Sequence, residues 1–357
     1  MASERTEKSS FPPALRILLI LAATVIVLAG VYVVRGIVGP VALAAVIVII
    51  CYPIGPALER RGAPRWVSGT AVVLLAYLVL AFLALLLVFA ISEFVRLIQG
   101  LVPDFQNLTN EVLTWLDTLG VGATIGDQVT QIFSVSNIVS VVSSVSGDAL
   151  SAGTAFFFVL AYVIFMSFDA GRYAGAEKAF GSRIRSFVDR IGAYSQSVRR
   201  YFVVNASFGL IVAAVDGVAL WFLHVPGALV WAILSFVTNF IPNIGFVLGL
   251  VPPAILALVT NDWVTALIVV AIYCVANVTL QVLIQPKFVS DAVGLTLTLS
   301  FLSVIFWTFI IGPLGAILSI PLTLFVRALA LETDPDARWM RWLSGDDGVL
   351  DEKPPAA

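Results

Sequence analysis

Two apolar segments between residues 225 and 327 are each interrupted by residues that break helices. The first break reads FIPNIG at residues 240–245, and the second reads IGPLG at residues 311–315. A further proline follows each break, at Pro252-Pro253 and at Pro321, so the segments echo each other at an offset of about seventy residues. One uninterrupted apolar span, Trp263 to Ile284, separates them. Paired broken helices that a single crossing places in opposite orientations are typical of membrane transporters.

The composition places the chain among membrane proteins. Hydrophobic residues make up 60% of the sequence and charged residues 12%, which is far outside the range of a soluble domain. The formal net charge of −2, with basic residues that cluster at the ends of apolar runs, indicates no nucleic-acid partner. Cys51 and Cys274 lie inside apolar spans and His224 is the single histidine, so we expect no disulfide, no metal site and no cofactor.

Charge and hydropathy together predict an all-α polytopic protein with about six full spans and two broken helical hairpins in inverted orientation. Segments flanked by Lys and Arg are assigned to the cytoplasm. The expected segments are a cytoplasmic N-terminus (1–14), three N-terminal spans (15–91), an external amphipathic arm (92–153), a fourth span (154–168), a cytoplasmic basic amphipathic helix (169–200), a transport core (201–328) and an acidic mobile C-terminal tail (329–357). Both termini are therefore expected in the cytoplasm.

The arm is assigned to the outside because Arg96 is its single basic residue, against a series of acidic ones. Apolar residues at three- and four-residue steps from Phe94 to Leu119 predict a helix within it. This helix lies on the membrane or packs against neighbouring subunits, or alternatively packs as a lid on its own protomer.

The number of crossings after His224 is open. An odd number must join an external His224 to an internal C-terminus, and either five full spans or one full span flanked by two re-entrant hairpins would supply it. The four pieces around the two breaks are about 13 to 17 residues long, shorter than the roughly 20 residues that a spanning helix needs. Irregular backbone inside a membrane is tolerated where it is buried in protein or lines a wet cavity. These lengths favour the hairpins.

Several motifs in the second half of the chain resemble those of one family. They are Tyr201-Phe202, the break at 241–245, Gln285-Pro286-Lys287, Val293-Gly294-Leu295 and the stretch from Gly315 to Pro321. Together they resemble the autoinducer-2 exporter family of bacterial membrane proteins. The resemblance implies export of small metabolites such as the furanone-type signal, sodium or lithium/proton antiport in some members, oligomeric assembly and a place in the bacterial inner membrane. The chain departs from the family pattern at Asn243, Phe246 and Thr296-Leu297, where an aromatic residue, a proline and His-Pro are common.

A polar stripe runs along the central span. Asn277, Gln281 and Gln285 recur every four residues and therefore share one helical face. Their amides both donate and accept hydrogen bonds, which suits a polar solute or a partly dehydrated cation. Alternatively they bond neighbouring helices, at about 0.6 kcal/mol per bond. Beside two broken helices we interpret the three together as pathway residues, whereas for Asn277 alone the bonding role is favoured.

The breaks supply the other candidate pathway residues. An unwound tip exposes backbone amides and carbonyls, and the N-terminus of a half-helix carries partial positive charge. The candidates are Asn239, Pro242, Asn243 and Gly245 in the first hairpin, and Gly312 and Pro313 in the second. A proline kink with satisfied asparagines is the alternative. Lys287 and Asp291 form a candidate gate, although reaching to the inner interface is the better explanation for Lys287.

Asp216 is the one acidic residue within the fifth span. At about 1.5 Å per residue it lies roughly 9 Å inside the outer end of that span at Phe222. An ionisable group at such depth is costly and is by default a functional candidate. Asn205, about three turns earlier, falls on the same face. Asp216 is therefore a candidate for proton coupling, unless it reaches the outer interface or is held by hydroxyl and amide groups of neighbouring helices.

The sequence predicts a secondary transporter and not an enzyme. We expect it to export a small polar organic solute such as an autoinducer-2-like signal, and its partners to be the bilayer, the solute or ion, and further copies of the chain. A monovalent cation (Na⁺ or Li⁺)/proton antiporter and a non-transporting membrane scaffold are the alternatives. The sequence holds neither the Gly-x-Ser-Gly motif of an intramembrane hydrolase nor the Gly-x-x-x-x-Gly-Lys loop of an ATP-driven pump.

Overall fold

The computed structural model describes residues 12–118, 149–173, 180–242, 245–285, 288, 294–332 and 337–350. These ranges are helical with connecting turns and contain no β-strand, which confirms the all-α class. The α-helices are α1 (Pro13–Val33), α2 (Arg35–Cys51), α3 (Ile54–Glu59), α4 (Arg65–Thr118), α7 (Ala149–Tyr173), α9 (Arg185–Phe222), α10 (Ala228–Thr238), α11 (Gly245–Thr260), α12 (Trp263–Asn277), α14 (Leu297–Ile311), α15 (Pro313–Ala330) and α16 (Arg338–Ser344). Two 3-10 turns, η1 (Gly181–Ile184) and η4 (Asp347–Leu350), and one π-helix, η2 (Val278–Ile284), complete the described elements.

Five of the described helices are long and apolar enough to cross a membrane. They are Arg35–Glu59, Arg65–Leu101, Arg185–Phe222, Trp263–Ile284 and Pro313–Ala330. The shorter apolar helices include Leu18–Val33 and Phe156–Ala170, at the positions of the expected first and fourth spans, and also α10, α11 and α14. The chain therefore has the architecture of a helical membrane protein, whereas the number of crossings and the re-entrance of the hairpins stay predictions.

Two helices continue through positions where a boundary was expected. Helix α4 passes residue 91 and extends into the expected arm as far as Thr118. Helix α9 joins the expected basic helix to the fifth span without a break at residue 200. Neither junction holds a glycine or proline, so the hydrogen bonds of each helix are uninterrupted there. The rest of the arm, residues 119–148, lies outside the described residues, and its placement stays a prediction.

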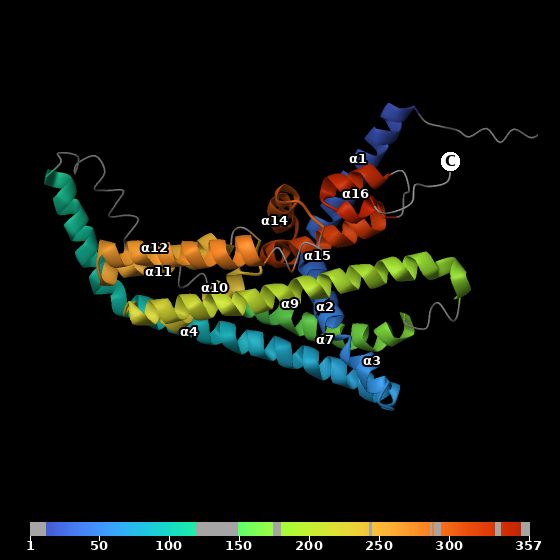
Figure 1. The fold of residues 1–357 in the computed structure, drawn as a ribbon, viewed down its shortest axis with the longest axis horizontal. Helices are drawn as coiled ribbons and strands as arrows, with labels where there is room; N and C mark the ends of the chain where they lie inside the picture. Colours follow the sequence, from blue (N-terminus) through green and yellow to red (C-terminus); the bar gives the residue numbers. More distant parts are fainter. Residues whose placement is uncertain are drawn as a thin grey trace, which may run out of the picture.

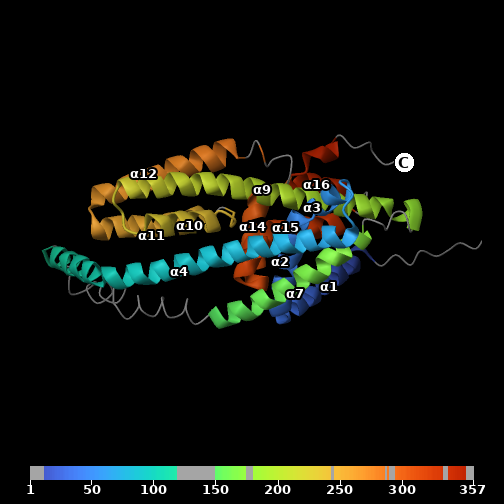
Figure 2. The same cartoon turned by 90° about the horizontal axis from the view of Figure 1, so that it is seen from below.

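Helix α9 is the axis on which both hairpins pack. It has 38 residues and is about 57 Å long, nearly twice the thickness of a hydrocarbon core. Hairpin α10–α11 lies on its C-terminal half, where a Cβ on Gly217 would come within 2.8 Å of the Cβ of Ala232. Hairpin α14–α15 lies on its N-terminal half, where the rings of Tyr194 and Phe325 are 5.6 Å apart. Figures 1 and 2 show α10, α11 and α12 along one half of α9, with α2, α15 and α16 toward the other half.

The tips of the two hairpins are closed by matching glycines. A Cβ on Gly245, the first residue of α11, would collide with the carbonyl oxygen of Thr238 at the end of α10. Gly315, about seventy residues later, stands in the same relation to the carbonyl oxygen of Trp307. The second tip also needs Gly312, whose φ of +86° is open to glycine at little cost. The repeat seen in the sequence is therefore reproduced as the same backbone contact.

A separate apolar core joins α2, α4 and α7. It contains Ala44, Cys51, Val72, Ala76 and Val163, all of them buried. Cys51 and Cys274 are both free thiols. This core connects the N-terminal helices to the body of the molecule through α2, which also packs on α9 and α15.

The C-terminal region differs from the expected mobile tail (329–357). Residues 337–350 form α16 and η4, and the backbone N–H of Thr296 donates to the carbonyl of Ser344 at 2.8 Å. An acidic composition predicts mobility when charges repel, but here Asp346 pairs with Arg341 at 3.0 Å. This pairing, together with the backbone contact to Thr296, explains why the segment is folded. Residues 351–357 lie outside the described residues.

Substitution of Gly245 by alanine should destabilise the protein, because the new methyl group must displace backbone and not a flexible side chain. We expect a loss of about 1–3 kcal/mol of stability, seen as a lower thermal midpoint in detergent. Gly30→Ala is the matched control, since no atom lies within 4 Å of its added Cβ in α1. Equal midpoints for the two variants would show that the first tip does not require glycine.

Candidate functional site: a polar cavity beside the first hairpin

A small cavity lies where α9, the first hairpin and α12 meet. Its volume is about 10 Å³, which is room for a single water molecule at most. Polar side chains dominate a lining that comes from α9, α10, α11, α12 and η2. The lining residues are Val212, Asp216, Ser235, Thr238, Asn239, Gly245, Phe246, Gly249, Tyr273, Asn277 and Gln281.

Asp216 is buried on the wall of this cavity. Its side chain is 2% exposed, and one carboxylate oxygen, Oδ2, accepts a hydrogen bond of 3.0 Å from the Ser235 hydroxyl. The other oxygen, Oδ1, is buried and has no hydrogen-bond partner within the described part of the chain. The two alternatives to a coupling role were that Asp216 reaches the outer interface or is held by groups of neighbouring helices. The structure shows a hydroxyl contact from a neighbouring helix, and it leaves Oδ1 without a hydrogen bond.

Two further buried atoms on the same cavity share this condition. The Tyr273 hydroxyl and Asn277 Oδ1 also lack hydrogen-bond partners among the described residues. Most buried polar atoms in proteins are hydrogen-bonded, so three unpaired ones on a single cavity indicate a place for a bound species. A carboxylate, a phenol and an amide oxygen together can accept a proton, coordinate a small cation or bind one water molecule.

A chain of amides lies next to the cavity and links three elements. Gln281 Nε2 donates to Asn239 Oδ1 at 2.6 Å, and Asn239 Nδ2 donates to the backbone carbonyl of Asn205 at 2.8 Å. Gln285 Nε2 donates to Asn205 Oδ1 at 2.6 Å. Asn239 can reach α9 because Gly209 leaves room, since a Cβ there would lie 2.7 Å from Asn239 Nδ2. The tip of the first hairpin is thereby bonded to both the fifth and the central span.

The central span positions its polar residues with an unusual helix geometry. It begins at the cap provided by Asp262, whose side chain accepts a 2.7 Å hydrogen bond from the backbone N–H of Thr265. After Asn277 the α-helix widens into the π-helix η2, and Gln285 N bonds to Leu280 O five residues earlier. Single π-turns inside α-helices are frequent at functional sites. Here the π-helix carries Gln281 and leads directly into Gln285.

The structure brings together only part of the predicted set. Asn239, Gly245, Asn277, Gln281 and Asp216 line the cavity, and Gln285 bonds beside it. Pro242 lies in the turn of the same tip. Gly312 and Pro313 lie elsewhere, because their tip packs on α2, where a Cβ on Gly39 would be 3.0 Å from Ile311 and 3.3 Å from Leu314. Asn243, Lys287 and Asp291 lie outside the described residues.

Four contributing residues were absent from the predicted site. Tyr273 extends the four-residue stripe of Asn277 by one turn toward the N-terminus, so the spacing could have identified it. Ser235 and Thr238 precede Asn239 on α10, but two hydroxyls on an apolar helix are a weak signal. Asn205 was placed on the face of Asp216, although its bonds to Asn239 and Gln285 depend on how the hairpin docks.

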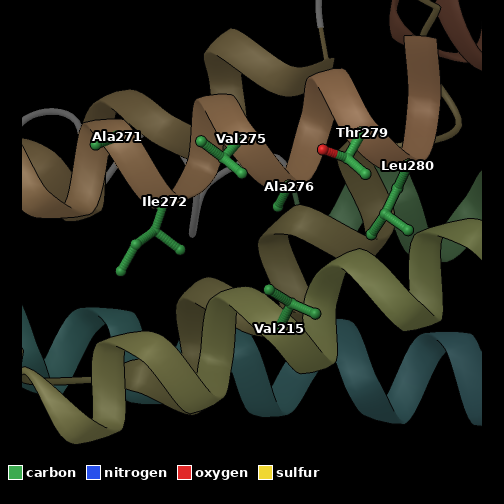
Figure 3. A pocket seen from close by; sticks show the side chains of 7 residues that line it. All are labelled: Val215, Ala271, Ile272, Val275, Ala276, Thr279 and Leu280. Atoms are coloured by element: carbon green, nitrogen blue, oxygen red, sulfur yellow. The ribbon is translucent and has the colours of Figure 1, made fainter. Parts of the chain in front are cut away.

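An apolar groove also lies between α9 and the central span. Figure 3 shows its walls, formed by Val215 and six residues of α12 and η2. The groove has a volume of about 420 Å³ and is lined by Val215, Ala271, Ile272, Val275, Ala276, Thr279 and Leu280. Val215, Ala276 and Leu280 each directly precede a cavity residue in the sequence, so the same helix pair contributes to both the apolar groove and the polar cavity. The groove offers no polar set of its own beyond the Thr279 hydroxyl.

Comparisons with known proteins agree with this architecture. A model of the AI-2E family transporter matches residues 21–333. The AI-2 transport protein TqsA of Escherichia coli is 29% identical over 322 residues, covering 89% of this chain and 92% of that protein. A putative transport protein of Haemophilus influenzae is 29% identical over 336 residues, covering 93% and 96%. The putative transport protein YhhT of Escherichia coli is 25% identical over 310 residues, covering 87% and 88%.

The family match spans most of the chain, and these relatives are described as transport proteins and not as enzymes. The apolar helices described above agree with that role. The chain belongs to the AI-2E family of membrane transporters.

Proposed function

We propose that this protein is a secondary transporter that exports a small polar organic solute, of the autoinducer-2-like or a related metabolite class. The observation that carries the proposal is the polar cavity and amide chain at the tip of a broken hairpin, bonded to two membrane-spanning helices. The Escherichia coli relative is an AI-2 transport protein, which supports the substrate class. Hydroxyl and carbonyl groups of such a solute match amides that can both donate and accept.

In this proposal Gln281, Asn239 and Asn205 are exchangeable partners. In the state described here Asn239 bonds to both of the others, and the cavity beside them has room for no more than one water molecule. A solute that enters between the hairpin and α12 would take over these bonds one at a time, which avoids leaving a buried amide unpaired. Gln281 lies in the π-helix, and π-turns are frequent at functional sites.

The first hairpin is proposed to be re-entrant. The open end of the hairpin lies at Gly227, which packs on Leu97 of α4. Leu97 is about 48 Å along α4 from Arg65, the first residue of that helix. The tip of the hairpin reaches Gly209 and Asn205 of α9, about 20 to 26 Å from the C-terminal end of that helix at Phe222. That depth is less than the roughly 30 Å of a hydrocarbon core, so the chain turns back inside the membrane.

A monovalent cation/proton antiporter is the second candidate function. The observation in its favour is the unpaired Oδ1 of Asp216 beside the Tyr273 hydroxyl and Asn277 Oδ1. Oxygen atoms are the ligands that hard cations prefer, and a carboxylate can exchange a cation for a proton. In either function Asp216 would be the group that couples flux to the proton gradient.

Re-entrance is tested by cysteine labelling in a chain with Cys51→Ala and Cys274→Ala. Two exposed reference positions mark the two membrane sides: Arg61 before α4 and Asn261 between α11 and α12. We expect Asn243→Cys to react with an impermeant thiol reagent from the side that labels Asn261→Cys, or from neither side. Reaction from the side that labels Arg61→Cys would mean that the first hairpin crosses the membrane completely.

Gln281→Leu should reduce flux while preserving insertion and folding. The substitution removes one hydrogen bond of about 1 kcal/mol from the pathway, which corresponds to about a fivefold slower transport step. Flux into proteoliposomes at equal protein density is the measurement, with an autoinducer-2-type furanone as the solute. Val282→Leu is the matched control, because Val282 is the next residue of η2 and its side chain is exposed on the surface of the protein. Equal flux in all three proteins would assign Gln281 to helix packing.

Asp216→Asn should remove the pH dependence of flux, since the amide keeps the shape of the carboxyl group and cannot exchange a proton. Tyr273 is the other titratable group on the cavity, so Tyr273→Phe is measured in parallel. The control is Asp262→Asn: the backbone hydrogen bond from Thr265 lowers the pKa of Asp262, so this carboxylate is already ionised below neutral pH. Removing the Asp262 carboxylate should leave the pH dependence of flux unchanged in an assay run between about pH 6 and pH 8. A wild-type profile in Asp216→Asn would exclude this residue from coupling under both candidate functions.

A further inference from the structure

Helix α16 has its polar residues turned inward and its apolar residues turned outward. On the inward side Ser344 is 9% exposed, and Arg338 and Arg341 are partly buried. On the outward side Trp339 is 59%, Met340 42%, Trp342 49% and Leu343 58% exposed. A helix on the surface of a water-soluble protein shows the reverse pattern. We call the four outward residues, Trp339, Met340, Trp342 and Leu343, the α16 face.

Specific contacts fix this orientation. Arg338 Nη2 donates to the backbone carbonyl of Val349 at 2.7 Å. Arg341 Nη2 lies 3.0 Å from Asp346 Oδ2, and the two side chains are 16% and 19% exposed. Both cations are therefore engaged on the inward side by η4 and the residue before it. Rotating the helix to bury the α16 face would break these contacts.

The helix is tied to the open end of the second hairpin. Thr296, which caps the start of α14, donates its backbone N–H to Ser344 O at 2.8 Å. Arg327, in the last turn of α15, donates to Gly294 O at 2.7 Å. Gly345 is required at this junction, because a Cβ there would lie 2.7 Å from Thr296 N. Helix α16 thus lies where two apolar helices of the hairpin begin and end.

Exposed apolar residues of α15 lead up to the α16 face. Phe325 is 40%, Val326 49% and Leu329 45% exposed on the last turns of this helix, which is apolar and long enough to span a membrane. The chain between Ala330 and Ala337 can extend no further than about 25 Å, so α16 stays near the end of α15. The lipid-facing surface of the hairpin therefore continues toward the two tryptophans.

We propose that the α16 face lies in the bilayer interface and anchors the start of the second hairpin at the membrane surface. Tryptophan is enriched at membrane–water interfaces, because its ring combines an apolar body with a polar N–H group. Methionine and leucine beside it supply the apolar area that holds an interfacial helix in place. The partner is the lipid at the boundary of headgroups and acyl chains, in the same bilayer that the spans cross.

The test uses tryptophan fluorescence of the full-length protein in lipid nanodiscs. The emission lost in Trp339→Phe/Trp342→Phe, relative to wild type, isolates the signal of the α16 face. We expect this difference signal to be quenched at least twofold by lipids brominated near the top of the acyl chain, and little by aqueous iodide. Trp231→Phe provides the control for a buried ring, because Trp231 is 2% exposed and its Nε1 donates to Pro226 O.

Two results would overturn the proposal. Quenching by iodide without quenching by brominated lipid would place the α16 face in water. Quenching by neither, as for Trp231, would show that another copy of the chain covers it. If the double variant does not yield folded protein, a nitroxide on Leu343→Cys, in the background with both native cysteines replaced, gives the same answer. Its relaxation should then respond more strongly to oxygen, which concentrates in lipid, than to a water-soluble nickel chelate.

Discussion

The arrangement around the cavity depends on the hydrogen bonds of the Asn239 side-chain amide. This amide lies where α10 ends, donates to Asn205 O on α9 and accepts from Gln281 on the central span. Backbone and side-chain polar groups inside a membrane have no water to bond with, so a broken helix is stable there only when protein groups take that place. Asn239 meets this condition and at the same time joins the tip to both neighbouring helices.

Close packing around α9 makes that contact possible. Gly209 leaves space for the Asn239 amide, and Gly217 lets α10 approach at Ala232. Small residues at helix interfaces allow such approaches in membranes, where association relies on packing and on hydrogen bonds. The same close approach encloses Asp216, with Ser235 as its partner on α10. Tight packing and a buried carboxylate are therefore two results of one helix contact.

The two hairpins share a backbone solution but have different surroundings. Gly245 and Gly315 each lie against a carbonyl of the preceding helix. The first tip is surrounded by amides and hydroxyls, whereas the second packs on the apolar side of α2 around Gly39. An internal repeat thus reproduces how the chain turns, while the residues around each turn decide whether it lies beside a polar cavity. This difference separates the candidate site from a structural element of the same shape.

The sequence alone determined the features that depend on neighbours within a few residues. Apolar runs defined the membrane class, prolines and glycines marked both hairpin tips, and the four-residue spacing placed Asn277, Gln281 and Gln285 on one side. Boundaries were less accurate: α4 and α9 continue where a change of charge had suggested a new segment, because charge does not interrupt helical hydrogen bonds. Contacts between distant residues were decided only by the tertiary structure. The meeting of Asp216 with Ser235 and Tyr273, the separation of the second tip from the cavity and the docking of α16 all depend on how helices pack, and helix packing is set by the combined shape of surfaces that no local pattern encodes.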